Sequence, residues 1–177
     1  MSRPITDRLQ PALLDRLTDD DPGHAAEGED QRVMTRTRLR QAVLRDLSWL
    51  FNAVQPLHRA AATAPALAPE VETSVLNFGL PPMSGQLASR VDIALLERTI
   101  RQAILRYEPR ILPESLQVRA LEAANVLETH NVIAFEIRGH LWSQPVPLEI
   151  LLRTRVDLEA GQVEVRDALA AGSPPRT

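Results

Sequence analysis

Residues 148–158 read LEILLRTRVDL, a stretch in which every second side chain is apolar or β-branched and most of the side chains between them are charged. A period of two places one set of side chains on one face of a β-strand and the other set on the opposite face. The stretch therefore predicts a long strand with one buried and one polar face. Residues 162–165, after Ala160-Gly161, predict a second strand that completes a hairpin with it.

Two further strands are expected before this hairpin. Their alternating apolar positions are Leu116, Val118 and Ala120 in the first and Ile133, Phe135 and Ile137 in the second. Polar residues separate these positions, as they do in a strand that is buried on one side only. The last third of the chain is thus expected to form a run of consecutive strands.

Helical spacing replaces this alternation in the earlier part of the chain. One helix has Leu39, Val43, Leu47, Leu50 and Val54 on its apolar face, widened by Leu44 and Phe51, and another has Leu96, Ile100, Ala103, Ile104 and Tyr107. We expect the later helix to start near Ser89, with Asp92 in a variant of the capping box, and to stop at Glu108-Pro109-Arg110. Helices followed by strands predict an α+β fold, with N-terminal helices packed on a largely antiparallel C-terminal β-sheet.

The segment between these two helices is expected to form a fixed corner. Residues 55–70 contain three prolines and predict an irregular connection. Val71 to Leu76 can form one or two helical turns, after which Gly79 can adopt a left-handed conformation. The pair Pro81-Pro82 then prevents the helix from continuing.

The N-terminal region differs in composition from the rest. Leu13, Leu14 and Leu17 fall on one side of a short helix that begins near Pro11, and the acidic, breaker-rich residues 19–30 follow as a linker. A short amphipathic helix on such a linker is either a frayed terminus or a peptide that docks on a partner, and the spacing leaves both open. We divide the chain into residues 1–31 (helix and linker), 32–167 (a single α+β domain) and 168–177 (a disordered tail).

Arginines crowd the beginning of the helix that carries Leu39. Arg32, Arg36, Arg38, Arg40 and Arg45 all precede its first acidic residue, Asp46. The helix dipole does not favour cations there, so these side chains need acidic partners elsewhere. They form either a solvated face that pairs with the acidic linker, which we favour, or a patch that binds a partner.

Composition excludes several classes of function. The chain has no cysteine, so it has no disulfide, thiol nucleophile or thiolate-bound metal, and all 20 of its basic residues are arginine, so it has no Schiff-base or phosphate-loop lysine. A net charge of −3 with 3% aromatic residues argues against binding to nucleic acid. The four histidines show no metal-ligand spacing, so we expect no metal and no cofactor.

No feature of the sequence predicts insertion into a membrane or export. No apolar run approaches the roughly eighteen residues of a membrane helix, and the polar N-terminus does not resemble a secretory signal. We therefore expect a soluble, cytoplasmic protein.

Glu108 is the one acidic residue whose position raises the question of catalysis. It lies at a helix end, yet the nearby Arg110 is expected to hold it ionised, which is the opposite of what a general acid requires. A structural Glu–Arg pair or an interface contact is therefore favoured over catalysis. Whether Glu114 or Glu136 approaches Glu108 is left open by the sequence.

Several of these stretches occur in the same order in a known family. They are residues 13–17 (LLDRL), Arg45-Asp46-Leu47, residues 74–81 (SVLNFGLP) and Glu108-Pro109-Arg110. From about Leu13 to Val165 the chain resembles the TssE family, the baseplate subunits of type VI secretion machines, and the related wedge protein of contractile phage tails. It departs from that family at Phe78, where tyrosine is usual, and at Pro82-Met83, where Asp-Leu is common.

The resemblance implies a non-catalytic subunit of a membrane-docked baseplate. Its partners would be other wedge subunits and sheath proteins, with no nucleic acid, membrane insertion or small-molecule substrate. The implied partner-binding residues are Glu108, Pro109 and Arg110, which would contact the helical core bundle of the wedge, and Leu13, Leu14, Arg16 and Leu17 of the docking helix.

The resemblance also implies a role for the last strands, and it leaves two alternatives. Residues 148–158 and 162–165 would accept a strand of the sheath by β-augmentation and so help to start sheath polymerisation. One alternative is a peptidoglycan hydrolase, after an old lysozyme label of the phage relative, supported only by Glu108 and by other acidic residues of unknown proximity. The other is a module that binds a small ligand, for which no residue argues.

Overall fold

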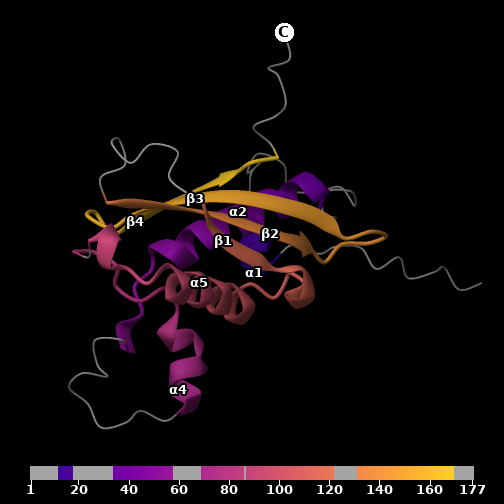
Figure 1. Ribbon diagram of the computed structural model, residues 1–177. Helices are drawn as coiled ribbons and strands as arrows, with labels where there is room; N and C mark the ends of the chain where they lie inside the picture. The colour runs from indigo at the N-terminus through magenta and orange to yellow at the C-terminus, as the bar shows by residue number, and fades with distance from the viewer. Residues whose placement is uncertain (1–11, 18–33, 58–68, 86, 122–130, 170–177) are drawn as a thin grey trace, which may run out of the picture.

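The computed structural model describes residues 12–17, 34–57, 69–85, 87–121 and 131–169 (Figure 1). Its helices are α1 (Leu13–Leu17), α2 (Arg36–Asn52), α4 (Pro69–Thr73) and α5 (Ile93–Tyr107), with 3₁₀ turns at Val75–Asn77, Ala88–Arg90 and Pro113–Ser115. Its strands are β1 (Gln117–Leu121), β2 (Val132–Leu141), β3 (Leu148–Asp157) and β4 (Gln162–Asp167). The acidic linker and most of the expected tail lie outside these residues.

The four strands form one antiparallel sheet in the order β1-β2-β3-β4. The two long central strands pair over their whole length, from Val132 opposite Asp157 to Leu141 opposite Leu148. Every second residue of β3 from Ile150 to Val156 is buried, as the alternating sequence predicts. The structure therefore confirms the α+β fold with a C-terminal antiparallel sheet.

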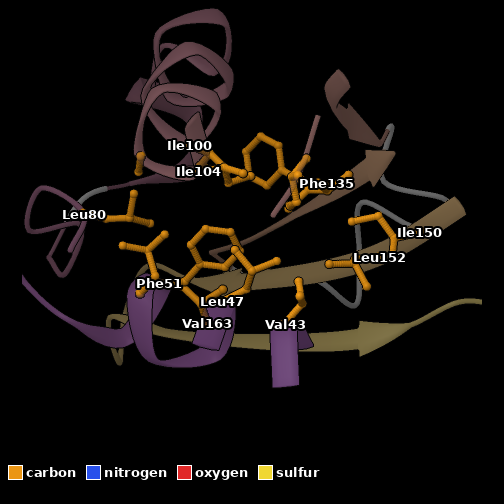
Figure 2. Packing of buried hydrophobic residues seen from close by; sticks show 14 of the residues in the cluster. Val43, Leu47, Phe51, Leu80, Ile100, Ile104, Phe135, Ile150, Leu152 and Val163 are labelled. Atoms are coloured by element: carbon orange, nitrogen blue, oxygen red, sulfur yellow. The ribbon is translucent and has the colours of Figure 1, made fainter. Parts of the chain in front are cut away.

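Both long helices cover the same face of this sheet, with α2 against β4 and α5 against β1 (Figure 1). Their apolar side chains meet those of the sheet in one core, in which Leu47, Ile104 and Phe135 are fully buried (Figure 2). Each such side chain contributes about 1.5–3 kcal/mol by leaving water. The opposite face of the sheet carries exposed arginines such as Arg119 and Arg153.

The expected apolar face of α2 is confirmed except at its end. Leu39, Val43, Leu47, Leu50 and Phe51 are buried, and Leu44 packs at the edge of the core. Val54 was expected on this face, but α2 ends at Asn52, and Val54 is 56% exposed and bridges to Leu80. The chain becomes extended at Ala53, which breaks the helical period before Val54 is reached.

The expected start of α5 near Ser89 is wrong. Asp92 is itself the N-cap, and its carboxylate accepts a hydrogen bond of 2.9 Å from the backbone N–H of Leu95. Residues Ala88–Arg90 form a separate 3₁₀ turn, and Val91 is extended, so no continuous helix joins them to α5. The expected face of α5 is confirmed, because Leu96, Ile100, Ala103 and Ile104 are buried and Tyr107 packs against the core.

The corner between α4 and α5 is fixed at Gly79. Its φ is +123°, and an added Cβ would lie 2.3 Å from the carbonyl oxygen of Ala53. The close approach allows the Leu80 N–H to donate to that oxygen at 2.9 Å, while Gln55 N–H donates to Leu80 O. Only glycine combines a positive φ with so little space, which explains the expected special conformation at this position.

Tyr107, the last residue of α5, holds the other side of the corner. Its hydroxyl lies within hydrogen-bonding distance of two carbonyl oxygens, at 3.1 Å from Ser74 and 2.8 Å from Asn77. Phe78 packs edge-on against its ring, with the ring centres 5.2 Å apart. The corner is thereby attached directly to the end of α5, where Glu108 follows.

Candidate partner-binding site

The segment Glu108-Pro109-Arg110 leaves α5 and runs at once to the end of β2. The Glu108 N–H still donates to Ile104 O at 2.8 Å, as the C-cap of the helix. Two residues later the Arg110 carbonyl accepts a hydrogen bond of 2.7 Å from the Trp142 N–H, just beyond β2. The backbone is therefore held on both sides, so the segment presents its side chains from a fixed position.

Glu108 and Arg110 form the ion pair that the sequence predicts. Arg110 Nε lies 2.6 Å from Glu108 Oε1, and its Nη2 lies 2.5 Å from Oε2, so the guanidinium holds the carboxylate with two parallel hydrogen bonds. The Arg110 backbone N–H also donates to Oε1. Glu108 is only 3% exposed, so this pair lies at the edge of the core.

Arg110 also connects this pair to α2. Its Nη2 lies 2.5 Å from Asp46 Oδ2, and the other oxygen of Asp46 accepts a hydrogen bond of 2.9 Å from Arg45 Nε. Arg45 Nη1 then donates to Asp15 of α1 at 2.7 Å. We call the five residues Glu108, Arg110, Asp46, Arg45 and Asp15 the charge chain, because alternating charges connect the end of α5 through α2 to α1.

The charge chain raises the pKa of both of its arginines. Burial by itself acts to lower the pKa of Arg110, but the hydrogen bonds to Glu108 and Asp46 outweigh it. For Arg45 the same balance holds, with Asp46 and Asp15 as the acidic partners. A raised folded-state pKa gives stability that is fully present below the unfolded-state pKa of arginine, so both cations keep this contribution at neutral pH.

Three buried polar atoms of the charge chain have no hydrogen-bond partner within the part of the chain that the structure describes. They are Arg110 Nη1, Asp15 Oδ2 and Arg45 Nη2, the last of which lies 2.9 Å from Asp46 Oδ1 in an ion pair. Buried polar atoms in native proteins nearly always have a partner. The charge chain thus encloses polar atoms that its own members leave unsatisfied, whereas the neighbouring Pro109 is exposed.

The leucines of α1 face away from the domain. Leu13 is 71% and Leu17 is 74% exposed, and Leu14 is exposed as well. The Asp15–Arg45 hydrogen bond nevertheless places α1 beside α2, so the expected apolar edge is presented next to the charge chain. Arg16 belongs to α1, but the part of the chain that the structure describes does not include its side chain.

Sequence reasoning missed Asp15, Arg45 and Asp46 as members of the site. The expected need of the α2 arginines for distant acids is confirmed for Arg45 and also for Arg40, which donates to Glu149 O and lies 3.5 Å from Asp167. Glu136, whose approach to Glu108 was left open, pairs instead with Arg138 on the outer face of the sheet. The adjacent Arg45-Asp46 pair was visible in the sequence, but nothing there placed it beside Arg110.

Two further kinds of feature are absent from the described residues, a cluster of metal ligands and a membrane-spanning helix. Across these ranges, no three His, Asp or Glu side chains gather to hold a metal ion. None of the described helices is long and apolar enough to span a membrane. The charge chain and the exposed leucines of α1 are thus the features that the site can be built from.

The family model of the baseplate wedge protein gp25 matches residues 37–146. This chain belongs to the gp25 family. The match includes α2, the corner at Gly79, α5, Glu108-Pro109-Arg110 and strands β1 and β2. No curated protein and no solved structure matched the chain significantly.

The gp25 family is structural, so the chain is a wedge component of the baseplate of contractile tail or injection machinery and interacts with other baseplate proteins. The matched range begins at the second residue of α2 and therefore leaves α1 outside it. The part of the charge chain that joins α2 to the end of α5 lies within the match. It consists of Asp46, Glu108 and Arg110.

Proposed function

We propose that this gp25-family chain is the TssE-type subunit of a type VI secretion baseplate, where it joins wedge subunits and helps to start sheath polymerisation. The family match supports the baseplate role, and the motifs at residues 13–17, 74–81 and 108–110 support the type VI assignment. The proposed location is cytoplasmic, in a baseplate docked at the membrane. The observation that carries the proposal is the fixed presentation of Arg110 by the charge chain.

In this proposal Glu108 and Arg110 have different roles. Glu108 is buried and orients the guanidinium, whereas Pro109 is exposed and the Arg110 side chain is 24% exposed. The exposed part of the Arg110 side chain, beside Pro109, then contacts an acceptor of the partner, such as a carboxylate or the carbonyl groups at a helix end. Because both oxygens of Glu108 already accept hydrogen bonds from Arg110, we assign it no catalytic role.

The helix α1 is proposed as the second contact. Leu13 and Leu17 lie one turn apart on a helix and can fill an apolar groove of a neighbouring subunit. The Asp15–Arg45 hydrogen bond restricts where α1 can lie, which lowers the entropy lost on docking. Residues 1–31 are accordingly proposed as the docking helix and its linker, attached to the domain of residues 32–167.

A double variant of α1 tests this role in cells. Leu13→Asp with Leu17→Asp places charges in an apolar contact and is expected to abolish the sheath assemblies seen by fluorescence microscopy, with normal protein levels because both side chains are highly exposed. The matched control is Leu95→Asp, which changes an exposed leucine of α5 and is expected to leave assembly intact. Normal assembly with the double variant would contradict the proposed docking.

A further inference from the structure

The outer face of the sheet, opposite to α2 and α5, is covered by none of the described helices (Figure 1). Side chains on this face alternate along each strand with the buried ones of the core. On β3 they include Arg153 and Arg155, which are exposed on either side of the buried Thr154. The middle of this face is therefore open to a partner.

Arginines outnumber acidic residues in the three central rows of the outer face. A row consists of residues that lie opposite each other on neighbouring strands, and the charged members of these rows are Arg119, Arg138, Arg153, Arg155 and Arg166 with Glu136 and Glu164. Five arginines against two glutamates leave an excess of three positive charges, in a chain whose net charge is −3. Glu149 and Asp157 lie outside these rows, near the two ends of β3.

The two glutamates satisfy only two of these five arginines. Arg138 Nη2 lies 3.4 Å from Glu136 Oε1, and Arg166 Nη2 lies 2.5 Å from Glu164 Oε1. The remaining arginines have no ion pair with any residue that the structure describes, and we call them the arginine triad. They are Arg119, Arg153 and Arg155.

The register of the sheet places the arginine triad on one small area. Arg153 and Arg155 are two residues apart on the same strand, a spacing of about 7 Å, and Arg119 lies in the row of Arg153 but two strands away, at about 10 Å. Arg153 also lies directly opposite Arg166 on β4. Like charges in this position repel each other, so carboxylates from outside would relieve a repulsion that the free chain contains.

We infer that the arginine triad is a second docking surface, which binds an acidic segment of a neighbouring baseplate protein. Each guanidinium can hold a carboxylate with two parallel hydrogen bonds, and the complementary charge selects an acidic partner. The surface lies across the sheet from α2, which carries Arg45 and Asp46 of the charge chain. One chain can thus contact two neighbours at once. The inference needs only the baseplate role of the family and not the type VI assignment.

The acidic residues 19–30 of the same chain are a competing source of carboxylates. They lie in the segment between α1 and α2, and Arg45 attaches α1 to α2 through Asp15. Both described ends of that segment therefore belong to the side of the sheet that the helices cover. For this reason we assign the arginine triad to another protein, and the experiments below separate the two occupants.

Binding of labelled poly-L-glutamate to the purified chain tests the chemistry of the arginine triad. Fluorescence anisotropy at low ionic strength, where exposed charges are least screened, should detect binding to the wild type. Arg153→Gln with Arg155→Gln should weaken it about fivefold. The control Arg90→Gln with Arg98→Gln removes the same charge from exposed positions outside this face and should leave binding nearly unchanged.

Three results of this measurement would overturn the inference. Poly-L-glutamate does not bind to the wild type, or both double variants weaken its binding equally, so that net charge explains it. In the third result, vesicles of phosphatidylglycerol or single-stranded DNA bind more tightly than poly-L-glutamate and depend on the same arginines, so that the occupant is not a protein.

Cross-linking in purified baseplates identifies the occupant, because a chain without cysteine can carry one thiol at a chosen position. Gln117 is exposed and lines a hollow of about 100 Å³ with Arg119 and Arg138, so Gln117→Cys can carry a thiol-linked photo-cross-linker there. We expect cross-links to an acidic peptide of another baseplate protein, which are lost when Arg153→Glu and Arg155→Glu are added.

The same preparation reports separately on the proposed function, through the wedge proteins retained by the Arg110 segment. Cross-links to residues 19–30 of the same chain, or no cross-link at all, would refute the docking surface. If the wedge proteins are still retained in that case, the proposed function stands without this second surface.

Discussion

Arg110 connects the end of α5 to α2, because its guanidinium contacts an acidic residue at each of these two elements. Its guanidinium reaches Glu108 beside it and Asp46 on α2. Removing one member of a buried pair leaves the other charge without compensation, which costs more than the net contribution of the pair. The side chain therefore combines a structural role with the proposed contact to a partner.

Replacing Arg110 by lysine tests whether the shape of the guanidinium stabilises the fold beyond its positive charge. Arg110→Lys keeps the cation but loses the fork that holds both oxygens of Glu108, so we expect the free energy of unfolding to fall by about 1–2 kcal/mol. Urea denaturation followed by circular dichroism measures it. The matched control is Arg138→Lys, whose pair with Glu136 is exposed and whose effect should stay within about 0.5 kcal/mol. Equal effects of the two changes would contradict the special geometry of Arg110.

For individual residues of the site, the sequence predicts only the contact between close neighbours in the chain. Glu108 and Arg110 are two residues apart, so their pairing follows from proximity. Asp46 is 64 positions from Arg110, and Asp15 is 30 from Arg45, and no pattern in the sequence identifies such partners. Their positions depend on how α1, α2 and α5 pack, which is decided by the core rather than by the charges.

Among the elements, we expect the corner at Gly79 to lose the most stability when a single methyl group is added. Gly79→Ala forces a Cβ to within 2.3 Å of Ala53 O at a positive φ, so we expect a loss of about 2–4 kcal/mol in the free energy of unfolding. Gly85→Ala is the control, because Gly85 has a φ of +80° but no atom within 4 Å of the added Cβ. It should cost about 1 kcal/mol. Thermal unfolding of both variants separates the two effects. The loss in Gly85→Ala reports the positive φ alone, and the additional loss in Gly79→Ala reports the close contact with Ala53.

The N-cap of α5 gives a second prediction for the elements. Asp92→Ala removes the acceptor for the Leu95 N–H and should lower the free energy of unfolding by about 0.5–2 kcal/mol. Asp92→Asn is the control, because asparagine keeps an acceptor oxygen and should retain most of the stability. If the alanine variant were as stable as the wild type in urea denaturation, Asp92 would not be the cap on which α5 depends.

The helices and strands were largely predictable because burial repeats along them with a fixed period. Ile150 to Val156 are buried at every second position, and Leu96 to Ile104 follow the helical spacing. The ends of helices were less predictable. Capping depends on one side chain, so Asp92 could be read as an interior partner of Ser89, and the chain at Ala53 leaves the helix although Val54 continues its apolar pattern.

At the scale of the whole molecule, the two helices cover one face of the sheet (Figure 1), and Arg110 connects the end of α5 to Asp46 of α2. The charge chain lets α1 contact the domain through Arg45, which is about one third exposed. Asp15→Asn removes that charge, and we expect a loss of global stability below about 1 kcal/mol. Hydrogen exchange in α1 should accelerate, with α2 and α5 unchanged. Equally accelerated exchange in α5 would show that α1 is part of the core.

The central claim is that this gp25-family chain binds neighbouring baseplate subunits through the segment that the charge chain holds. Co-purification of the tagged protein with the baseplate and sheath proteins of the same cells tests it, with wild type, Arg110→Ala and the exposed control Arg138→Ala compared. Circular dichroism must first show that each variant is folded.

We predict that the wild type and Arg138→Ala retain the wedge proteins, whereas folded Arg110→Ala loses them by at least about tenfold, as the loss of one charged interface contact implies. Full retention by folded Arg110→Ala, or no baseplate protein retained by the wild type, would contradict the account.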